Sequence, residues 1–150
     1  MSWEARCNWT ISRTGLSARW TFRYQEVLQL DKLLCGRRAL VVEDEMLIVM
    51  MIEDMLGELG CKSVTTAATN EQAISLIGTQ SFDAAMLDMN LNGQKSQVVA
   101  DALVIRRVPF VFSTGNSSSD IWDGYAHHAV TRKPFLFNEL ATTLTRLLRA

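Results

Sequence analysis

Short apolar runs alternate with stretches of helical periodicity along most of the chain. Runs that are consistent with buried strands lie at 39–42, 63–67, 84–87, 108–113 and 129–131. Between them the spacing of apolar residues predicts helices at 46–59, 69–77, 97–107, a short one reaching 126, and 138–149. Five strands alternating with five helices predict an α/β fold with a doubly wound parallel sheet.

Turn and cap residues mark the ends of several of these elements. Gly60 follows the first predicted helix, and glycine is the residue that most often ends a helix. Thr69 stands three residues before Gln72, which is the pattern of a capping box that opens a helix. Asn92-Gly93 predicts a turn between the third strand and the third helix. These local signals agree with the periodicity.

Length and composition limit the class of protein. The chain has 150 residues, 48% of them hydrophobic, which suits one ordinary folded domain and excludes a disordered chain. It contains no run of about 18 uncharged apolar residues, so no membrane span is predicted. Its first twenty residues lack the apolar block of a secretory signal. We therefore expect a cytoplasmic protein without membrane contact.

The net charge of −1 hides an uneven distribution. Residues 1–38 carry seven basic and three acidic side chains, whereas residues 39–150 carry eight basic and thirteen acidic ones. The composition changes near Gly36, so we predict an N-terminal extension over 1–36 and a folded domain over 37–150. Aromatic residues alternate with arginines near Trp20, which suggests a hairpin or arm. Packing on the chain itself or on a partner is favoured over nucleic-acid binding, because no helix-turn-helix pattern is present.

Residues with reactive or charged side chains follow the predicted strands. Glu43 and Asp44 follow the first strand, Asp88 the third, Thr114 the fourth and Lys133 the fifth. In open parallel sheets the site lies beyond the carboxyl ends of the strands, so we expect these side chains to converge. Three carboxylates together need a cation, and Mg²⁺ suits such oxygen ligands. The lysine and the threonine suit phosphate oxygens, and an aspartate can be a nucleophile, so the pattern predicts phosphoryl transfer onto a carboxylate.

Four motifs at these strand ends resemble the signatures of bacterial response-regulator receiver domains. They lie, in the order of that family, at 40–45, 86–90, 112–115 and 132–135. One such match is weak, but four in register are specific, and the resemblance covers roughly residues 37–150. It implies a flavodoxin-like receiver fold. It also implies a phosphorylation-controlled protein-interaction switch in two-component signal transduction, which is a signalling module rather than an enzyme.

The resemblance implies a role for each matching residue. Asp88 would be the phospho-acceptor and a metal ligand, and Asp44 would be a direct Mg²⁺ ligand. Glu43 would bind Mg²⁺ through water, and the backbone carbonyl of Asn90 would be a third protein ligand. The threonine and the lysine after the fourth and fifth strands would bind the phosphoryl oxygens.

A narrower resemblance concerns the phosphate donor. Segments similar to receivers that work with HWE-type histidine kinases, mostly of alphaproteobacteria, lie at 36–45, 67–69, 91–93, 99–103 and 108–112. The implied partner is a histidine kinase of this type or a histidine phosphotransferase, and the downstream protein is not identified. Two positions depart from the family pattern. Asn92-Gly93 replaces Met-Pro-Gly, and Val130 stands where an aromatic switch residue is usual, so output through residues 116–125 is an alternative.

The first predicted helix carries a candidate docking surface. On a helical wheel Leu47, Met50 and Met51 lie near Asp54 on the polar side, away from the predicted buried stripe. Either the N-terminal segment covers these three apolar residues or they form a protein-docking surface. In receivers that resemble this chain, the first helix packs on the helical bundle of the kinase.

Several functions stay open from the sequence. The favoured one is the phosphorylation-controlled switch, and the alternatives are a phosphoryl shuttle or sink in a phosphorelay, or the receiver fragment of a hybrid histidine kinase. A DNA-binding regulator acting through the basic N-terminal segment is less favoured. The oligomeric state, including a homodimer, is not decided by the sequence.

Overall fold

A five-stranded parallel sheet forms the centre of the protein. The computed structural model describes residues 34–115 and 121–150. The strands lie in the order β2-β1-β3-β6-β7, and each neighbouring pair is parallel. Their bounds are Arg38–Val42 for β1, Ser63–Ala67 for β2, Ala84–Asp88 for β3, Phe110–Thr114 for β6 and Val130–Arg132 for β7. The chain crosses from β2 over β1 to β3, so the direction of winding reverses between β1 and β3, as in doubly wound folds.

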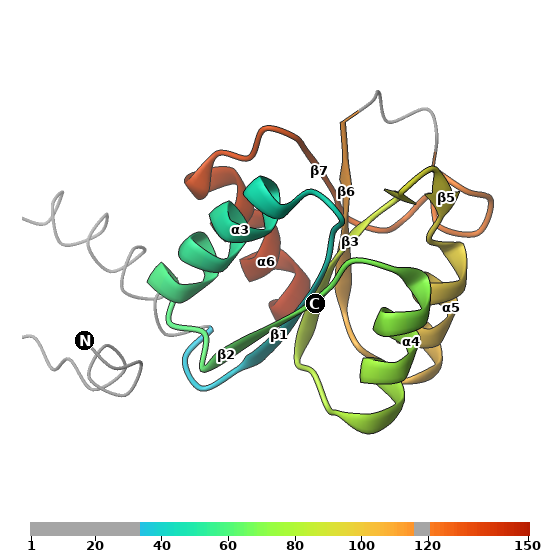
Figure 1. Ribbon diagram of the computed structural model, residues 1–150. Coiled ribbons are helices and arrows are strands. Elements are labelled where there is room, and N and C mark those ends of the chain that lie inside the picture. The colour runs from blue at the N-terminus through green and yellow to red at the C-terminus, as the bar shows by residue number, and fades with distance from the viewer. Residues whose placement is uncertain (1–33, 116–120) are drawn as a thin grey trace, which may run out of the picture.

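Helices cover both faces of this sheet (Figure 1). Helices α3 (Met46–Glu58) and α6 (Phe137–Arg149) lie on one face, and α4 (Asn70–Thr79) and α5 (Gln97–Ile105) lie on the other. The predicted doubly wound α/β sheet is therefore confirmed, with four helices instead of five in the part of the chain that the structure describes. A membrane-spanning helix is not found among the described residues.

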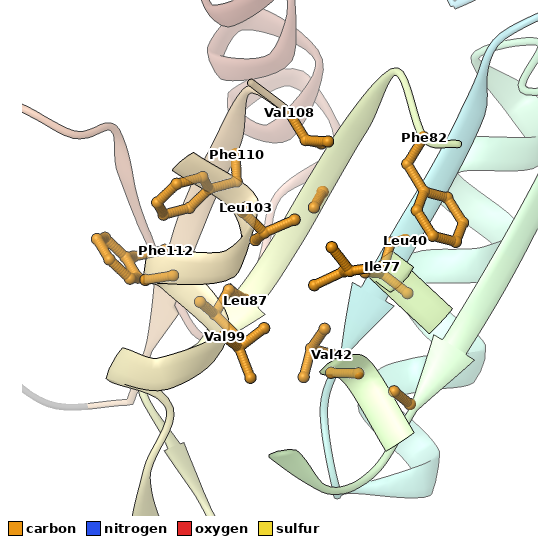
Figure 2. Packing of buried hydrophobic residues seen from close by; sticks show 14 of the residues in the cluster. Leu40, Val42, Ile77, Phe82, Leu87, Val99, Leu103, Val108, Phe110 and Phe112 are labelled. Carbon is orange, nitrogen blue, oxygen red and sulfur yellow. The ribbon is translucent and has the colours of Figure 1, made fainter. Parts of the chain in front are cut away.

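Alternation of side chains along the strands divides the core into two layers. Leu40 and Val42 of β1 face α4 and α5, whereas Val41 between them faces α3 and α6. Figure 2 shows the first layer, in which Leu87 of β3 and Leu103 of α5 belong to the same buried cluster. Because both faces of the sheet are buried, the strands are almost continuously apolar, as the short apolar runs in the sequence predicted.

Two of the predicted local signals are visible as hydrogen bonds and backbone angles. The Thr69 hydroxyl accepts a hydrogen bond from the Gln72 backbone N–H at 3.2 Å and caps α4. The Gln72 side-chain oxygen in turn accepts from the backbone N–H of Ala68 at 3.0 Å, so the two residues act as a slightly shifted capping box. Gly60, with φ of 88°, follows the end of α3.

A small hairpin follows β3 and was not predicted as strands. It consists of β4 (Asn90–Leu91) and β5 (Gln94–Lys95), joined by the predicted turn. Asn92 has φ of 50° and Gly93 φ of 80°, and positive values at both positions are what a type I′ hairpin turn requires. Leu91 is buried in the layer below α4 and α5, so this side chain anchors the hairpin to the core.

The predicted short helix reaching Ala126 is wrong for the residues that can be compared. Residues 122–128 form successive turns, and the segment 116–120 lies outside the described residues. Gly124 has φ of 89°, and the ring of Tyr125 lies against Phe112 with centroids 5.7 Å apart. Aromatic packing on the sheet thus replaces helix formation here. The predicted extension over 1–36 also lies outside the described part, apart from residues 34–36.

Candidate functional site

Acidic side chains from two neighbouring strands converge at the carboxyl end of the sheet. Glu43 and Asp44 follow β1, and Asp88 is the last residue of β3. The ladder pairs Val42 with Leu87, so these chain ends lie at the same height. One ligand oxygen from each of the three carboxylates lies within 4.8 Å of the others. The strand order therefore produces the cluster, as expected for a site at the switch point of a doubly wound sheet.

Lys133 inserts its ammonium group between two of these carboxylates. Its Nζ lies 2.7 Å from Glu43 Oε2 and 2.7 Å from Asp88 Oδ2, and 3.5 Å from Glu45 Oε1 at the surface. The Lys133 backbone N–H donates to the carbonyl of Thr114 at 2.9 Å. This hydrogen bond connects Lys133 to the end of β6. Thr114 is buried there, and β6 pairs with β3, the strand that carries Asp88.

Burial and charge shift the protonation of this cluster. Burial, aided by the nearby charge of Asp88, raises the pKa of Glu43 to about 7, although hydrogen bonding to Lys133 opposes this. Burial lowers the pKa of Lys133, but its hydrogen bonds to Asp88 and Glu43 outweigh that effect and raise the pKa overall. A cationic lysine among three carboxyl groups leaves the cluster short of positive charge.

Backbone N–H groups fix the orientation of all three carboxylates. The N–H of Asn90 donates to Asp88 Oδ1 at 3.1 Å, and the N–H of Asn92 at the hairpin turn donates to Asp44 Oδ2 at 3.0 Å. Glu43 Oε1 accepts from the N–H two residues later in its own loop at 3.2 Å. Each carboxylate keeps further lone pairs for a ligand. These donors are backbone atoms, so no residue pattern predicts them apart from the turn at Asn92-Gly93.

The donor set fits Mg²⁺. Three carboxylates with oxygens inside one small volume provide the hard oxygen ligands that this ion prefers. The cluster is only partly neutralised by Lys133, so a divalent cation would complete the charge balance. Asn90 begins β4 two residues after Asp88, which places its backbone at the same edge of the sheet.

The predicted docking residues differ in their surroundings. The side chains of Leu47 and Met50 on α3 are 82% and 55% exposed. Met51, in contrast, is half-buried and packs against the core layer below α3 and α6, so its assignment to the exposed side is wrong. Ile48 and Met55, one turn before and after Met51 on α3, pack against the same layer, so Met51 lies on that side of the helix. Met46, which is 76% exposed, extends the apolar surface instead.

Aromatic residues of the segment 121–125 pack on β6, a contact that the sequence analysis did not predict. Val130 is partly buried in the layer below α4 and α5 and carries no ring. Phe112 instead contacts Trp122 and Tyr125, with ring centroids 5.4 Å and 5.7 Å away. The Tyr125 hydroxyl donates to Asp101 of α5. The aromatic character of residues 121–125 was the available signal for this contact.

Fold and site together define an α/β protein with an acidic, lysine-containing cluster at the carboxyl edge of its parallel sheet. The family model of the response regulator receiver domain matches residues 39–145 of this chain. The chain therefore belongs to that family.

Proteins of known structure or role are similar to this chain. The solution structure of SdrG from Sphingomonas melonis Fr1 has 41% sequence identity and a TM-score of 0.69, and the match covers 75% of this chain and 97% of SdrG. The receiver domain of the sensor histidine kinase PA1611 from Pseudomonas aeruginosa PAO1, solved with magnesium in its active-site cleft, has 28% identity and a TM-score of 0.65. That match covers 77% of this chain and all of the PA1611 domain, 100%.

A transcriptional regulatory protein, YvrH of Bacillus subtilis (strain 168), is 32% identical over 111 residues. The match covers 70% of this chain but only 46% of YvrH, so this chain spans less than half the length of that relative. The similarity therefore concerns only part of YvrH.

Proposed function

We propose that this receiver accepts a phosphoryl group from a histidine kinase on Asp88 and acts as a phosphorylation-controlled protein-interaction switch. One observation carries the proposal. The Asp88 carboxylate lies in a cluster with two further carboxylates, and its Oδ2 is 2.7 Å from the Lys133 ammonium. A nucleophilic carboxylate beside a cation is the arrangement that transfer of an anionic phosphoryl group requires.

Asp88 has a defined chemical role in this proposal. A carboxylate oxygen of Asp88 forms a bond to phosphorus while the bond between phosphorus and the donor breaks, and the donor keeps that electron pair. Lys133 balances charge on the phosphoryl oxygens, and the Thr114 hydroxyl donates a hydrogen bond to one of them. The buried position of Asp88 limits the access of water to the product.

We propose Mg²⁺ as the cofactor of this reaction. Asp44 and Asp88 would bind it directly, Glu43 through water, and Asn90 through its backbone carbonyl. Bound Mg²⁺ supplies positive charge that draws the donor phosphate and the Asp88 carboxylate together. The magnesium in the cleft of the PA1611 receiver supports this assignment.

We further propose that an HWE-type histidine kinase, or a histidine phosphotransferase, docks on α3. This helix begins two residues after Asp44, so a protein bound to its first turns would lie over the acidic cluster. Its exposed apolar side chains there are Met46, Leu47 and Met50. An exposed apolar group of this size beside a reactive site suits a protein partner, and methionine adapts to varied surfaces.

The folded domain is proposed to extend over 37–150, after an extension over 1–36. The family match over 39–145 lies within these bounds. Leu34 is buried in the core layer below α3 and α6, so the last residues of the extension support the domain. Destabilisation of the 150-residue chain by Leu34→Ala would test that support.

A second candidate function is favoured by the similarity to the PA1611 receiver, which belongs to a sensor histidine kinase. In that case the chain passes phosphoryl groups on, as a shuttle or sink or as the receiver of a hybrid kinase. Rapid transfer of label from the phosphorylated chain to a histidine phosphotransferase would favour this alternative over a switch.

Labelling with acetyl phosphate tests the proposal. In Mg²⁺ the wild type should take up one phosphoryl group, and Asp88→Asn should take up none, because an amide is a poor nucleophile. Asp54→Asn on the exposed side of α3 is the matched control and should label like the wild type. Equal labelling of Asp88→Asn and the wild type would show that the acceptor is another residue.

A further inference from the structure

Polar side chains form a row across the sheet next to the site. The ladders place Asp88 of β3 beside Ser113 of β6, and Ser113 beside Thr131 of β7. All three residues are buried. Their neighbours two positions earlier belong to the core layer below α3 and α6, so alternation directs the row to that same face. These neighbours are Met86, Val111 and Ala129.

Ser113 is the unusual member of this row. Its side chain is 2% exposed, and within 34–115 and 121–150 its Oγ has no hydrogen-bond partner. Proteins rarely keep a buried hydroxyl unpaired, because such a group has lost its hydrogen bonds to water. An apolar residue such as alanine would fit the pattern of β6 better. A hydroxyl at this point therefore suggests a hydrogen bond in another state of the protein.

Asp88 is the cross-strand neighbour that can supply this bond. Adjacent strands are about 4.8 Å apart, so rotation of the Ser113 side chain about its Cα–Cβ bond can bring its hydroxyl to the Asp88 carboxyl group. In the present state Asp88 Oδ1 accepts from the Asn90 N–H and Oδ2 from Lys133. A phosphoryl group on Asp88 would change these bonds, because Lys133 would then turn to the phosphoryl oxygens and leave the carboxyl group with one donor fewer.

We propose that Ser113 donates a hydrogen bond to the carboxyl group of phosphorylated Asp88 and speeds loss of the phosphoryl group. This inference rests on the proposed phosphorylation of Asp88. In hydrolysis the oxygen of a water molecule bonds to phosphorus while the bond between phosphorus and the Asp88 oxygen breaks. The electron pair of that bond returns to the carboxylate, and the water gives its proton to solvent.

The hydrogen bond acts on the leaving group of this step. Negative charge develops on the Asp88 carboxyl group as the phosphoryl group departs, and a donor already in place stabilises that charge more than it stabilises the uncharged acyl carbonyl of the aspartyl phosphate. The hydrogen bond stabilises this charge equally when a histidine nitrogen, rather than water, attacks the phosphorus. Ser113 would therefore shorten the lifetime of the phosphorylated state and favour transfer of the phosphoryl group over its storage.

Phosphoryl lifetimes test the role of Ser113. The protein is labelled with acetyl phosphate in Mg²⁺, the donor is removed by gel filtration, and the remaining label is followed with time. Ser113→Ala should extend the half-life about tenfold, equivalent to about 1.4 kcal/mol in the barrier. Ser113→Thr keeps a hydroxyl and should return the half-life close to the wild-type value. Thr131→Val, one strand further from Asp88, is the matched control and should not change it.

Each outcome separates this inference from the function on which it rests. If Ser113→Ala labels normally and loses label at the wild-type rate, the role of Ser113 is refuted and phosphorylation of Asp88 stands. A longer half-life that Ser113→Thr does not shorten would indicate altered packing and would also refute it. If the wild type takes up no label, the proposed function fails, and this role fails with it. Unfolding in urea should show Ser113→Ala at least as stable as the wild type, because the lost hydroxyl has no hydrogen-bond partner among the described residues of the unphosphorylated protein.

Discussion

Replacing Lys133 by methionine removes the charge that holds two carboxylates together. Methionine keeps most of the apolar stem but leaves no ammonium group 2.7 Å from Glu43 Oε2 and Asp88 Oδ2. The side chains of all three residues are largely or fully buried, so water replaces the lost charge poorly. Lys133→Met should therefore destabilise the protein when no divalent cation is present.

The size of this loss depends on pH. Removing one partner of a buried ion pair costs about 3–5 kcal/mol when the remaining charges must stay ionised. Glu43 can escape by taking up a proton, because its pKa in the folded protein is already raised to about 7, and loss of the lysine raises it further. Because the pKa of Glu43 is higher in the folded protein than in the unfolded chain, this residue favours folding at pH values below its unfolded-state pKa. That contribution to stability is lost as the pH rises through its folded-state pKa. We expect a loss of about 3 kcal/mol at pH 8 and a clearly smaller loss at pH 6.

Urea unfolding with EDTA or with Mg²⁺ measures this effect. Mg²⁺ should stabilise Lys133→Met more than the wild type, because in the variant the ion supplies the positive charge that the cluster lacks. Lys95→Met, at an exposed position of β5, is the control. It should change neither the free energy of unfolding nor the stabilisation by Mg²⁺. The reasoning is refuted if Lys133→Met loses the same free energy at pH 6 and pH 8, or if Mg²⁺ stabilises both proteins equally.

Three further outcomes are expected. Mg²⁺ affinity, measured by calorimetry, should rise about tenfold from pH 6 to pH 8. The reason is that the Glu43 carboxyl group, with a pKa of about 7, becomes about ten times more ionised over this range. An unchanged affinity would exclude Glu43 from the metal site. Met50→Asp should slow phosphotransfer from the kinase at least about tenfold, equivalent to about 1.4 kcal/mol in the barrier, while acetyl phosphate still labels the protein. Loss of both reactions would indicate a damaged fold. Gly93→Ala should lower the free energy of unfolding in urea by about 1–2 kcal/mol, because φ is +80° and an added Cβ meets nothing within 4 Å, so only backbone strain is added. A much larger loss would mean that the substitution disrupts more of the hairpin than the turn.

The sequence predicted the sheet well because the strands are short, buried runs with clear ends. Periodicity placed β2 at its observed bounds of Ser63–Ala67, and β1 and β3 within one residue. The strand β6 begins at Phe110 rather than at 108, since Pro109 has no N–H to donate to the ladder. The strands of the β4–β5 hairpin, two residues each, are too short for any periodicity to show.

Features that depend on tertiary contacts could not be predicted. The convergence of Asp88 and Lys133 followed from motifs at strand ends, but the hydrogen bond from the Asn92 N–H to Asp44 depends on the path of the hairpin. The helical wheel placed Met51 near Asp54 on the polar side, but in the structure Met51 packs against the layer below α3 and α6, a contact that depends on the tertiary fold. The position of Ser113 beside Asp88 requires the pairing of β3 with β6, which a single sequence does not show.

Chemical mapping of the phosphorylated residue tests the central proposal most directly. The protein is incubated with acetyl phosphate and Mg²⁺ and then treated with sodium borohydride, which reduces an aspartyl phosphate to homoserine. Mass spectrometry of the peptides should find homoserine at position 88 and aspartate unchanged at Asp44 and Asp83, with the product absent when EDTA replaces Mg²⁺. Homoserine at another position, or an intact aspartate at 88 in fully labelled protein, would contradict the assignment of Asp88 as the phosphoryl acceptor.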